Sequence, residues 1–433
     1  MRKLAYIAEV CSVSPIKGAD RLEEVMLKGH GWKIVTSKGD FSVGDLCVMF
    51  EIDSFLDSDD ERYAFLRERC LRKFVSKSGT VLRQGLKIKT IKLRGVVSQG
   101  LIMPLDMFPE IVERVRDFKK EYVRERCISD EELVGKVFIE ETAEEYNARK
   151  DYEDSEFRTE NPDCLPPPRV YYTKDNDEWR NHCVPLVGAD VTKLLKIEHY
   201  DEVKEQLQPE TGSPISADAM GNFPTDYCPK TDEVRLQGLT EYFETQKGKL
   251  FEVTEKRDGS SISFGYCPII DAENPFMVCS RNLRLKPVKA DRSVPMMWQT
   301  VTSMGLEEKC KSVPNLMFQA EFCGMGVNKN RDRLNEYTIE VFRIYNVDKQ
   351  EFVESRARME LCKKLGIPHV PVIEEALDVF NKFHNIDEIL PYADGKTSRG
   401  NPREGLVFKE VGTTHPCTFK VVSNKYLLSE KED

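Results

Sequence analysis

The segment at residues 251–261 places one lysine directly before a tight turn, with the pattern Lys256-Arg257-Asp258-Gly259. Apolar residues flank the pattern, so we predict a strand, a turn and a second strand. A lysine amine attacks phosphorus only when it is unprotonated, and the ordinary lysine pKa is about 10.4. If Lys256 is a nucleophile, neighbouring cations must lower its pKa. By itself the pattern is weak, because a surface lysine beside a hairpin turn is its more common meaning.

Five further segments downstream combine polar residues with apolar, strand-like runs. Divalent metals such as Mg²⁺ and Mn²⁺ prefer oxygen ligands and retain bound waters, so the carboxylates of Asp258 and Glu404 are suitable metal ligands. The alternative for each acid is a solvated carboxylate at a turn or a strand end. The five segments are Cys279-Ser280-Arg281-Asn282, Phe318-Gln319-Ala320-Glu321, Ile339-Glu340-Val341-Phe342, residues 404–409 beginning with Glu404-Gly405, and residues 419–425 beginning with Phe419-Lys420.

In this order, the segments resemble the motifs of the covalent nucleotidyltransferases, the superfamily of ATP-dependent polynucleotide ligases and mRNA capping enzymes. The chain is most similar to the Naegleria-type RNA ligases, which carry an OB domain before the nucleotidyltransferase domain. The resemblance covers about residues 1–105 and 186–428. Phrases of the N-terminal part that also look like this family are residues 15–21, 43–46, 50–54 and 93–101.

The resemblance implies a role for each motif residue. Lys256 would be the catalytic nucleophile that accepts AMP from ATP, and Phe342 would stack on the adenine. Glu321 and Arg281 would contact the ribose or the phosphates, and Lys420 would contact the α-phosphate. A metal held by Asp258 and Glu404 would act with Lys420 to lower the pKa of Lys256.

Some positions weaken or qualify this assignment. An aromatic residue inside a strand, such as Phe342, is more often part of a core, and we expect Phe318 to be a core residue. Ala320 stands where many relatives have glycine. The last motif has Val422 where a second lysine is common, and Lys425 is a candidate replacement for it.

The elements that must position these residues fall into two regions. Residues 1–105 contain five or six short strand-like runs separated by glycines, which predicts an OB-like β-barrel. Residues 186–433 mix strand runs with helical segments, expected for example at residues 191–195 and 361–365. This predicts an α+β nucleotidyltransferase domain with antiparallel sheets.

Residues 106–185 lack apolar periodicity, carry acidic groups and contain three successive prolines at residues 166–168. We predict a partly helical linker or insertion there, which adds no motif and is dispensable for catalysis.

Composition limits the classes of partner. The chain has 433 residues and a net charge of −10, but residues 1–105 hold 18 Lys and Arg against 13 Asp and Glu. Within the run of residues 62–94, eleven basic residues accompany one acid. This run is either a solvated charged face or a track for a phosphate backbone. Its candidate nucleic-acid contacts are Arg83, Lys87, Lys89, Lys92 and Arg94.

Other features predict a location in the cytosol or the nucleus. No run of eighteen apolar residues could span a bilayer, and the N-terminus does not resemble a secretory signal. Thirteen cysteines without a C-x-x-C spacing are typical of reduced thiols.

Together, these features predict an ATP-dependent RNA ligase that joins 3′-hydroxyl and 5′-phosphate RNA ends through lysyl-AMP. Three alternatives stay open: a capping-type guanylyltransferase, a DNA ligase of the same superfamily, and a non-enzymatic RNA-binding relative. Domain order argues against the capping enzymes, which normally carry their OB domain last. Retention of the charged motif residues argues against a non-enzymatic relative.

Overall fold

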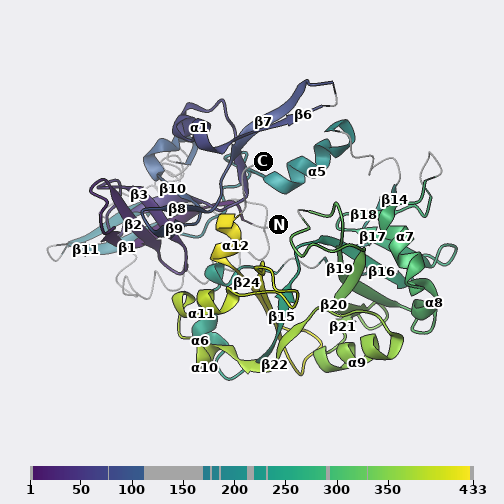
Figure 1. Cartoon of the computed structure of the whole chain (residues 1–433). Helices are drawn as coiled ribbons and strands as arrows, with labels where there is room; N and C mark the ends of the chain where they lie inside the picture. Colours follow the sequence, from purple (N-terminus) through teal and green to yellow (C-terminus); the bar gives the residue numbers. More distant parts are fainter. Residues whose placement is uncertain are drawn as a thin grey trace, which may run out of the picture. The chain divides into compact units, whose positions relative to one another are not determined.

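The structure is a computed structural model that describes residues 3–76, 78–111, 169–175, 178–184, 187–211, 219–230, 233–288, 293–328 and 330–429. The chain forms two compact units (Figure 1). The first comprises residues 1–28 and 32–211, and the second comprises residues 29–31 and 212–433. None of the helices formed by the described residues is long and apolar enough to cross a membrane.

The first unit is built around a five-stranded antiparallel sheet. β1 is long, and its residues 5–9 pair with β4 whereas its residues 10–15 pair with β2. A register shift between Val10 and Ser12 separates the two parts, and such a bulge bends a strand and increases its twist. The sheet therefore curls, as the predicted β-barrel requires. In sheet order the strands are β10 (Leu101–Pro104), β4 (Leu46–Phe50), β1 (Ala5–Pro15), β2 (Leu22–Leu27) and β3 (Lys33–Ser37).

Apolar side chains on the two faces of this sheet form separate cores. One core includes Ile7, Val48 and Phe50, and the other includes Trp32 and Met49. These residues alternate along β1 and β4, as expected for strands that are buried on both faces. The remaining elements of the unit are β5 (Ser54–Leu56), η1 (Glu61–Leu66), α1 (Arg67–Cys70), β6 (Leu71–Val75), β7 (Val81–Lys87), β8 (Ile91–Leu93), β9 (Val96–Ser98), η2 (Leu105–Met107), β11 (Arg169–Asp175), β12 (Glu178–Val184), β13 (Glu198–His199) and α5 (Tyr200–Thr211).

The segment at residues 187–211 belongs to the first unit, although the sequence analysis assigned it to the nucleotidyltransferase domain. The hydroxyl of Thr192 accepts hydrogen bonds from the backbone N–H groups of Leu4 and Ala5, both at 3.0 Å. The prediction of a helix at residues 191–195 is wrong. These residues form turns that end at Lys196, whose φ is +55°. Pairing of β13 with β5 strengthens the attachment.

The predicted linker at residues 106–185 is only partly described. Residues 112–168 lie outside the described residues. At the end of the predicted linker, β11 and β12 pair along their length as an antiparallel hairpin. Regular secondary structure is therefore present where the sequence analysis expected a partly helical linker.

The second unit contains two antiparallel sheets. The larger one has, in order, β14 (Ala219–Asn222), β18 (Leu283–Leu285), β17 (Phe276–Ser280), β16 (Ser260–Tyr266), β19 (Leu316–Cys323), β20 (Thr338–Asn346) and β21 (Glu351–Phe352). The smaller one has β22 (Val372–Asp378), β15 (Leu250–Lys256), β23 (Gly405–Glu410) and β24 (Thr418–Val422). This arrangement confirms the predicted α+β class with antiparallel sheets.

Helices cover these sheets and close their cores. Val301, Leu306 and Cys362, from three different helices, pack with the apolar residues of β16, β19 and β20. A second core is rich in aromatic residues from β15, β23, β24 and α10, including Phe251 and Phe380. The helices are η3 (Leu236–Gly238), α6 (Tyr242–Thr245), α7 (Met296–Ser303), α8 (Leu306–Lys311), α9 (Ser355–Leu365), α10 (Val379–Lys382), α11 (Ile386–Ala393) and α12 (Asn424–Ser429).

Candidate active site

Lys256 is the last residue of β15, and the turn that follows it leads from the smaller sheet into the larger one. Asp258 lies in this turn, as the sequence predicted. Gly259 is required there, because a Cβ atom would lie 2.5 Å from the carbonyl oxygen of Phe322 and 2.8 Å from Cγ of Glu321. The close approach of β19 therefore explains the glycine of the motif.

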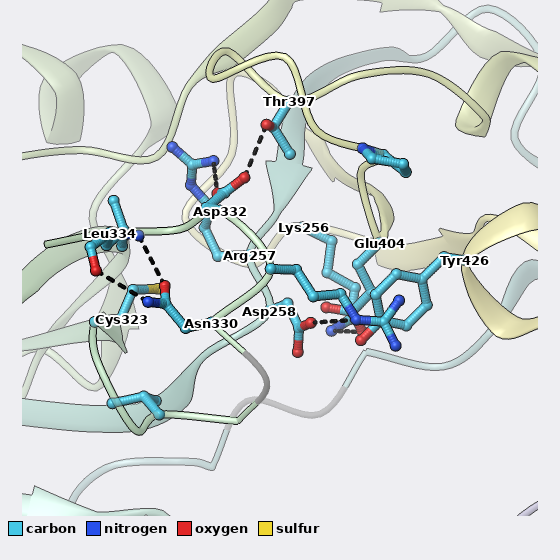
Figure 2. A pocket seen from close by; sticks show the side chains of 14 residues that line it. Lys256, Arg257, Asp258, Cys323, Asn330, Asp332, Leu334, Thr397, Glu404 and Tyr426 are labelled. Atoms are coloured by element: carbon cyan, nitrogen blue, oxygen red, sulfur yellow. Dashed lines mark hydrogen bonds and ion pairs between the residues drawn. The ribbon is translucent and has the colours of Figure 1, made fainter. Parts of the chain in front are cut away.

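Two acids from other strands reach Lys256. Glu404 directly precedes β23, and its Oε1 lies 2.5 Å from Nζ of Lys256. Glu321, on β19, accepts a hydrogen bond of 3.1 Å from the backbone N–H of Gly259. The antiparallel register accounts for both, because Lys256 pairs with Gly405, and Glu321 pairs with Ser261. Figure 2 shows Lys256, Asp258 and Glu404 around one pocket.

The carboxylates determine the charge state of the lysine. Burial disfavours the ammonium of Lys256, but the negative charges of Glu404, Glu321 and Asp258 outweigh this effect and raise its pKa. Burial also raises the pKa of Glu321 to about 8, despite the nearby Lys256. The expected lowering of the Lys256 pKa is therefore not produced by the protein groups, because the dominant neighbours are carboxylates.

Lys420 is near this cluster, whereas Lys425 has a different partner. Lys420 lies on β24, and its positive charge acts on the carboxylate of Glu404. Lys425 is largely exposed, and its Nζ lies 3.3 Å from a carboxylate oxygen of Asp394. Val422, which stands where a second lysine is common in relatives, is buried in the structure.

The other two predicted nucleotide-binding residues lie at different positions on the larger sheet, Arg281 just after β17 and Phe342 in the middle of β20. Arg281 follows β17 and is exposed, one residue beyond Ser280, which pairs with Ile262. Phe342 lies on β20 at a register shift, because Gln319 pairs with Arg343 but Ala320 pairs with Val341. Phe342 is half-buried, whereas Phe318 is fully buried and stacks on Phe264 as a core residue.

The carboxylates fit a metal that is delivered together with a nucleotide. Among the described residues, no group of three or more His, Cys, Asp or Glu side chains is arranged to hold a metal ion. Mg²⁺ is usually bound through one or two carboxylates together with waters and substrate phosphates. Asp258 and Glu404 match this pattern.

Several residues of the site were missed in the sequence analysis. Arg257 is buried behind the turn, where its Nε lies 2.6 Å from Glu340 and its Nη1 lies 2.8 Å from Glu255 and 3.2 Å from Asp332. This network ties the turn to the loop that connects β19 and β20. Because Glu340 and Asp332 are distant from Arg257 in the chain, no local sequence pattern indicates them.

The basic run of the first unit is partly neutralised. Arg83 forms an ion pair with Glu198, and Nζ of Lys87 lies 3.2 Å from Asp53 and 4.3 Å from the ring centre of Tyr200. Lys89 is half-buried, whereas Lys92 on β8 and Arg94 in the turn after it are exposed. Of the five candidates, Lys92 and Arg94 therefore have the greatest access to a large ligand.

Comparisons with known proteins agree with this architecture. A family model described as RNA ligase matches residues 249–427, and a model described as an OB-fold domain matches residues 4–105. A mutant of the Naegleria gruberi RNA ligase solved with ATP and Mn is 28% identical, with a TM-score of 0.69 and 100% of both chains covered. The same ligase with PPi is also 28% identical, with a TM-score of 0.69 and 99% of both chains covered. No curated protein sequence matched the chain.

The RNA ligase model covers the antiparallel α+β domain in which Lys256 stands at a strand end among three carboxylates. The chain thus carries an OB-fold domain at residues 4–105 followed by an RNA ligase domain at residues 249–427. The predicted family, domain order and enzyme class are thereby confirmed. Another mutant of the Naegleria ligase was solved with AMP and Mn, at 28% identity, a TM-score of 0.69 and 98% coverage of both chains, and both nucleotide complexes agree with the predicted cofactors.

Proposed function

We propose that this chain seals RNA ends that carry a 3′-hydroxyl and a 5′-phosphate, through a covalent lysyl-AMP intermediate. The observation that carries the proposal is the position of Lys256 at a strand end beside Glu404, Glu321 and Asp258 within an RNA ligase domain. A structural lysine would need one carboxylate partner, whereas a nucleotide site needs a nucleophile together with groups that bind phosphates and a metal.

The reaction consists of three nucleotidyl transfers. In the first, the unprotonated Nζ of Lys256 attacks the α-phosphorus of ATP, a P–N bond forms, and the P–O bond to the departing pyrophosphate breaks. In the second, an oxygen of the RNA 5′-phosphate attacks the same phosphorus, and the lysine amine leaves. In the third, the RNA 3′-hydroxyl attacks the activated 5′-phosphate, a phosphodiester forms, and AMP leaves.

The surrounding residues bind the nucleotide. Phe342 would stack on the adenine, and its half-buried position at a register shift supports this role over a core role. Arg281 and Glu321 would contact the ribose or the phosphates, and Lys420 would contact the α-phosphate. Glu321 on β19 and Lys420 on β24 lie near the Lys256 cluster, and Phe342 lies further along the larger sheet, a spread compatible with one extended nucleotide.

Asp258 and Glu404 would hold a divalent cation that arrives with ATP. When bound, the cation would supply positive charge that neutralises the phosphates and favours the unprotonated amine of Lys256. Glu404 would exchange its contact with the ammonium for this role, and the proton of Lys256 would leave before the attack.

The first unit would bind the RNA. Lys92 and Arg94 are the favoured phosphate contacts because they are exposed, and Arg83, Lys87 and Lys89 would add to the positive field. OB folds bind single strands through basic grooves and aromatic platforms. We also propose that the protein works in the cytosol or the nucleus, because the cysteines that the structure describes are free thiols.

Selectivity for RNA should come from the sugars that end in the 3′-hydroxyl. The 2′-hydroxyl and the A-form geometry distinguish RNA from DNA, and a misplacement of about 1 Å can cost roughly a hundredfold in rate. Base sequence should matter little, because phosphate contacts do not read base edges.

Two assays test this proposal. The purified protein is first incubated with α-³²P-ATP and, in parallel, with α-³²P-GTP, and then given nicks in which either strand end is RNA or DNA. We expect an AMP adduct, sealing when the 3′-hydroxyl strand ends in ribonucleotides, and tolerance of DNA on the 5′-phosphate side. A GMP adduct would identify a capping-type enzyme. Equal sealing of all-DNA nicks would identify a DNA ligase, and the absence of any adduct would identify a non-enzymatic relative.

A further inference from the structure

The carboxylate of Asp258 is held by side chains from two distant parts of the second unit. Nδ2 of Asn328, in the loop after β19, donates to Oδ1 of Asp258 at 3.1 Å, and Nε of Arg331 lies 3.5 Å from Oδ2. The hydroxyl of Tyr426, on α12, is buried and interacts with the charges of Glu404 and Asp258, and these effects raise its pKa. Only about 20% of the Asp258 side chain is exposed.

Arg331 and Tyr426 also bind each other. Cζ of Arg331 lies 4.0 Å from the centre of the Tyr426 ring, a cation–π distance, and Nη1 of Arg331 donates to Oγ of Ser429 at 2.9 Å. The guanidinium therefore spans from the C-terminal helix to the carboxylate of Asp258.

The start of α12 is in turn connected to Glu404. The backbone N–H of Ser423 donates to the carbonyl oxygen of Glu404 at 2.9 Å, and Oγ of Ser423 accepts a hydrogen bond of 3.1 Å from the N–H of Tyr426. The segment from Ser423 to Tyr426 thus contacts both candidate metal-binding acids. It reaches the carboxylate of Asp258 through Tyr426 and the backbone carbonyl of Glu404 through Ser423.

The same pocket contains all of these groups. Its lining includes Lys256, Asp258, Glu404, Arg331 and Tyr426. Figure 2 shows the ring of Tyr426 on the same side of the pocket as Lys256 and Glu404. A tyrosine that served only to fill a core would not need its hydroxyl directed at a charged side chain of the site.

We infer that Tyr426 and Arg331 are positioning residues that fix the carboxylate of Asp258 beside Lys256 in the orientation required to bind the divalent cation. This inference rests on the proposed function and adds two residues that the motif pattern does not contain. The hydroxyl of Tyr426 supplies a polar group that interacts with the carboxylate, and Arg331 supplies a positive charge on a guanidinium that packs against the Tyr426 ring. Groups behind a metal-binding carboxylate orient it and tune its affinity.

The test compares Tyr426→Phe with a matched control, Tyr392→Phe. Tyr426→Phe keeps the ring under Arg331 and removes only the hydroxyl. The hydroxyl of Tyr392, also in the second unit, is buried and has no hydrogen-bond partner among the described residues. Thermal unfolding first establishes that both variants fold like the wild type.

Two measurements are then made on each protein. The first is the Mg²⁺ concentration that gives half of the maximal rate of adenylylation at saturating ATP. The second is equilibrium binding of Mn²⁺ in the presence of α,β-methylene-ATP, followed by electron paramagnetic resonance of free Mn²⁺, which does not depend on turnover.

We expect Tyr426→Phe to raise the half-saturating Mg²⁺ concentration and to weaken Mn²⁺ binding, each by about tenfold. Tyr392→Phe should change neither. Arg331→Met should act in the same direction, and Arg331→Lys should recover part of the loss, because it keeps the charge but not the planar contact with the ring.

The inference is overturned if Tyr426→Phe and Arg331→Met bind Mn²⁺ like the wild type, whether or not their maximal rates fall. A failure of the proposed function has a different signature, since the wild-type protein itself would then form no adduct with ATP.

Discussion

Nζ of Lys256 lies 2.5 Å from Oε1 of Glu404, so the proposed nucleophile is paired with one of the acids that would bind the metal. This ion pair favours the ammonium form, in which the lysine cannot attack phosphorus. The same contact places the amine and the carboxylate where both could meet a triphosphate. Under the proposed function, this ion pair would be the resting state of the site, and Lys256 would become reactive when a cation and ATP take over the carboxylate.

Replacement of Lys256 by alanine should abolish the covalent AMP adduct, because it removes the amine that would accept AMP. The variant should still seal a nick whose 5′-phosphate is already adenylylated, since the final transfer does not use the lysine as a nucleophile. Gel labelling with α-³²P-ATP and sealing of a pre-adenylylated strand measure the two steps. Lys247→Ala, at an exposed lysine before β15, is the control. Substantial labelling of Lys256→Ala would refute the assignment.

Replacement of Glu404 by alanine should slow both adduct formation and the sealing of pre-adenylylated RNA. Loss of a carboxylate that organises a metal often costs tenfold to a hundredfold, and the deficit should be largest at limiting Mg²⁺. Glu410→Ala, at the far end of the same strand, is the matched control. If Glu404→Ala had wild-type rates at limiting Mg²⁺, Glu404 would be a structural partner of Lys256 and not a metal-binding residue.

Phe342 and Phe318 should respond differently to truncation. Phe342→Ala should raise KM for ATP with a small loss of stability, because this side chain is half-buried. Phe318→Ala should cost about 3–5 kcal/mol of unfolding free energy, because Phe318 is fully buried and its ring centre lies 5.3 Å from that of Phe264. Chemical denaturation and ATP titrations measure both effects. A core-sized loss of stability in Phe342→Ala, without a change in KM, would contradict adenine stacking.

Protonation of His369 should destabilise the protein in mild acid. Its Nε2 accepts a hydrogen bond of 3.0 Å from Arg358, which in turn binds the buried Glu252 near Lys409. Burial, followed by the charge of Arg358, lowers the pKa of His369 from its usual 6.5 to about 4. The unfolded chain therefore binds more protons between pH 6.5 and pH 4.

The free energy of unfolding should fall as the pH is lowered. The stabilising contribution of neutral His369 is complete above pH 6.5 and is lost as pH falls toward 4, by up to about 3 kcal/mol. His369→Gln should flatten this part of the stability profile, whereas the exposed control His384→Gln should not. Urea unfolding at pH 7, 6, 5 and 4 measures it, and identical slopes for wild type and His369→Gln would contradict the prediction.

RNA binding should depend more strongly on Arg94 than on Arg83. Arg94 is exposed in the turn after β8, whereas the charge of Arg83 is already paired with Glu198. Arg94→Ala should reduce the slope of log Kd against log salt by about one, and Arg83→Ala by less. Fluorescence anisotropy with a labelled RNA measures these slopes. Equal slopes for Arg94→Ala and wild type would show that the basic run of residues 62–94 is a solvated face and not a track for RNA phosphates.

The motif residues could be found from the sequence because each lies in or directly beside a strand, within a distinctive local pattern. The pattern Lys-x-Asp-Gly predicted the strand, turn and strand around Lys256, and the order of later segments predicted Glu321, Glu404 and Lys420. The apolar runs predicted the strands around them, because a strand buried in a sheet needs a continuous or alternating apolar face. The prediction of a helix at residues 191–195 failed because the hydroxyl of Thr192 accepts hydrogen bonds from the backbone N–H groups of Leu4 and of Ala5 at the start of β1. These partners are distant from Thr192 in the chain.

The sequence by itself determined the family, the order of the two domains and the class of fold, and it predicted Lys256 as the nucleophile, because these depend on local patterns and on their order along the chain. Only the tertiary structure decided that carboxylates raise the pKa of Lys256, that Arg257 lies in a buried ion network and that Tyr426 and Arg331 meet Asp258. These relationships join strands, a loop and a terminal helix that are far apart in the chain. Their strength depends on distance and burial, which strand register and packing set and which a list of residue types does not contain.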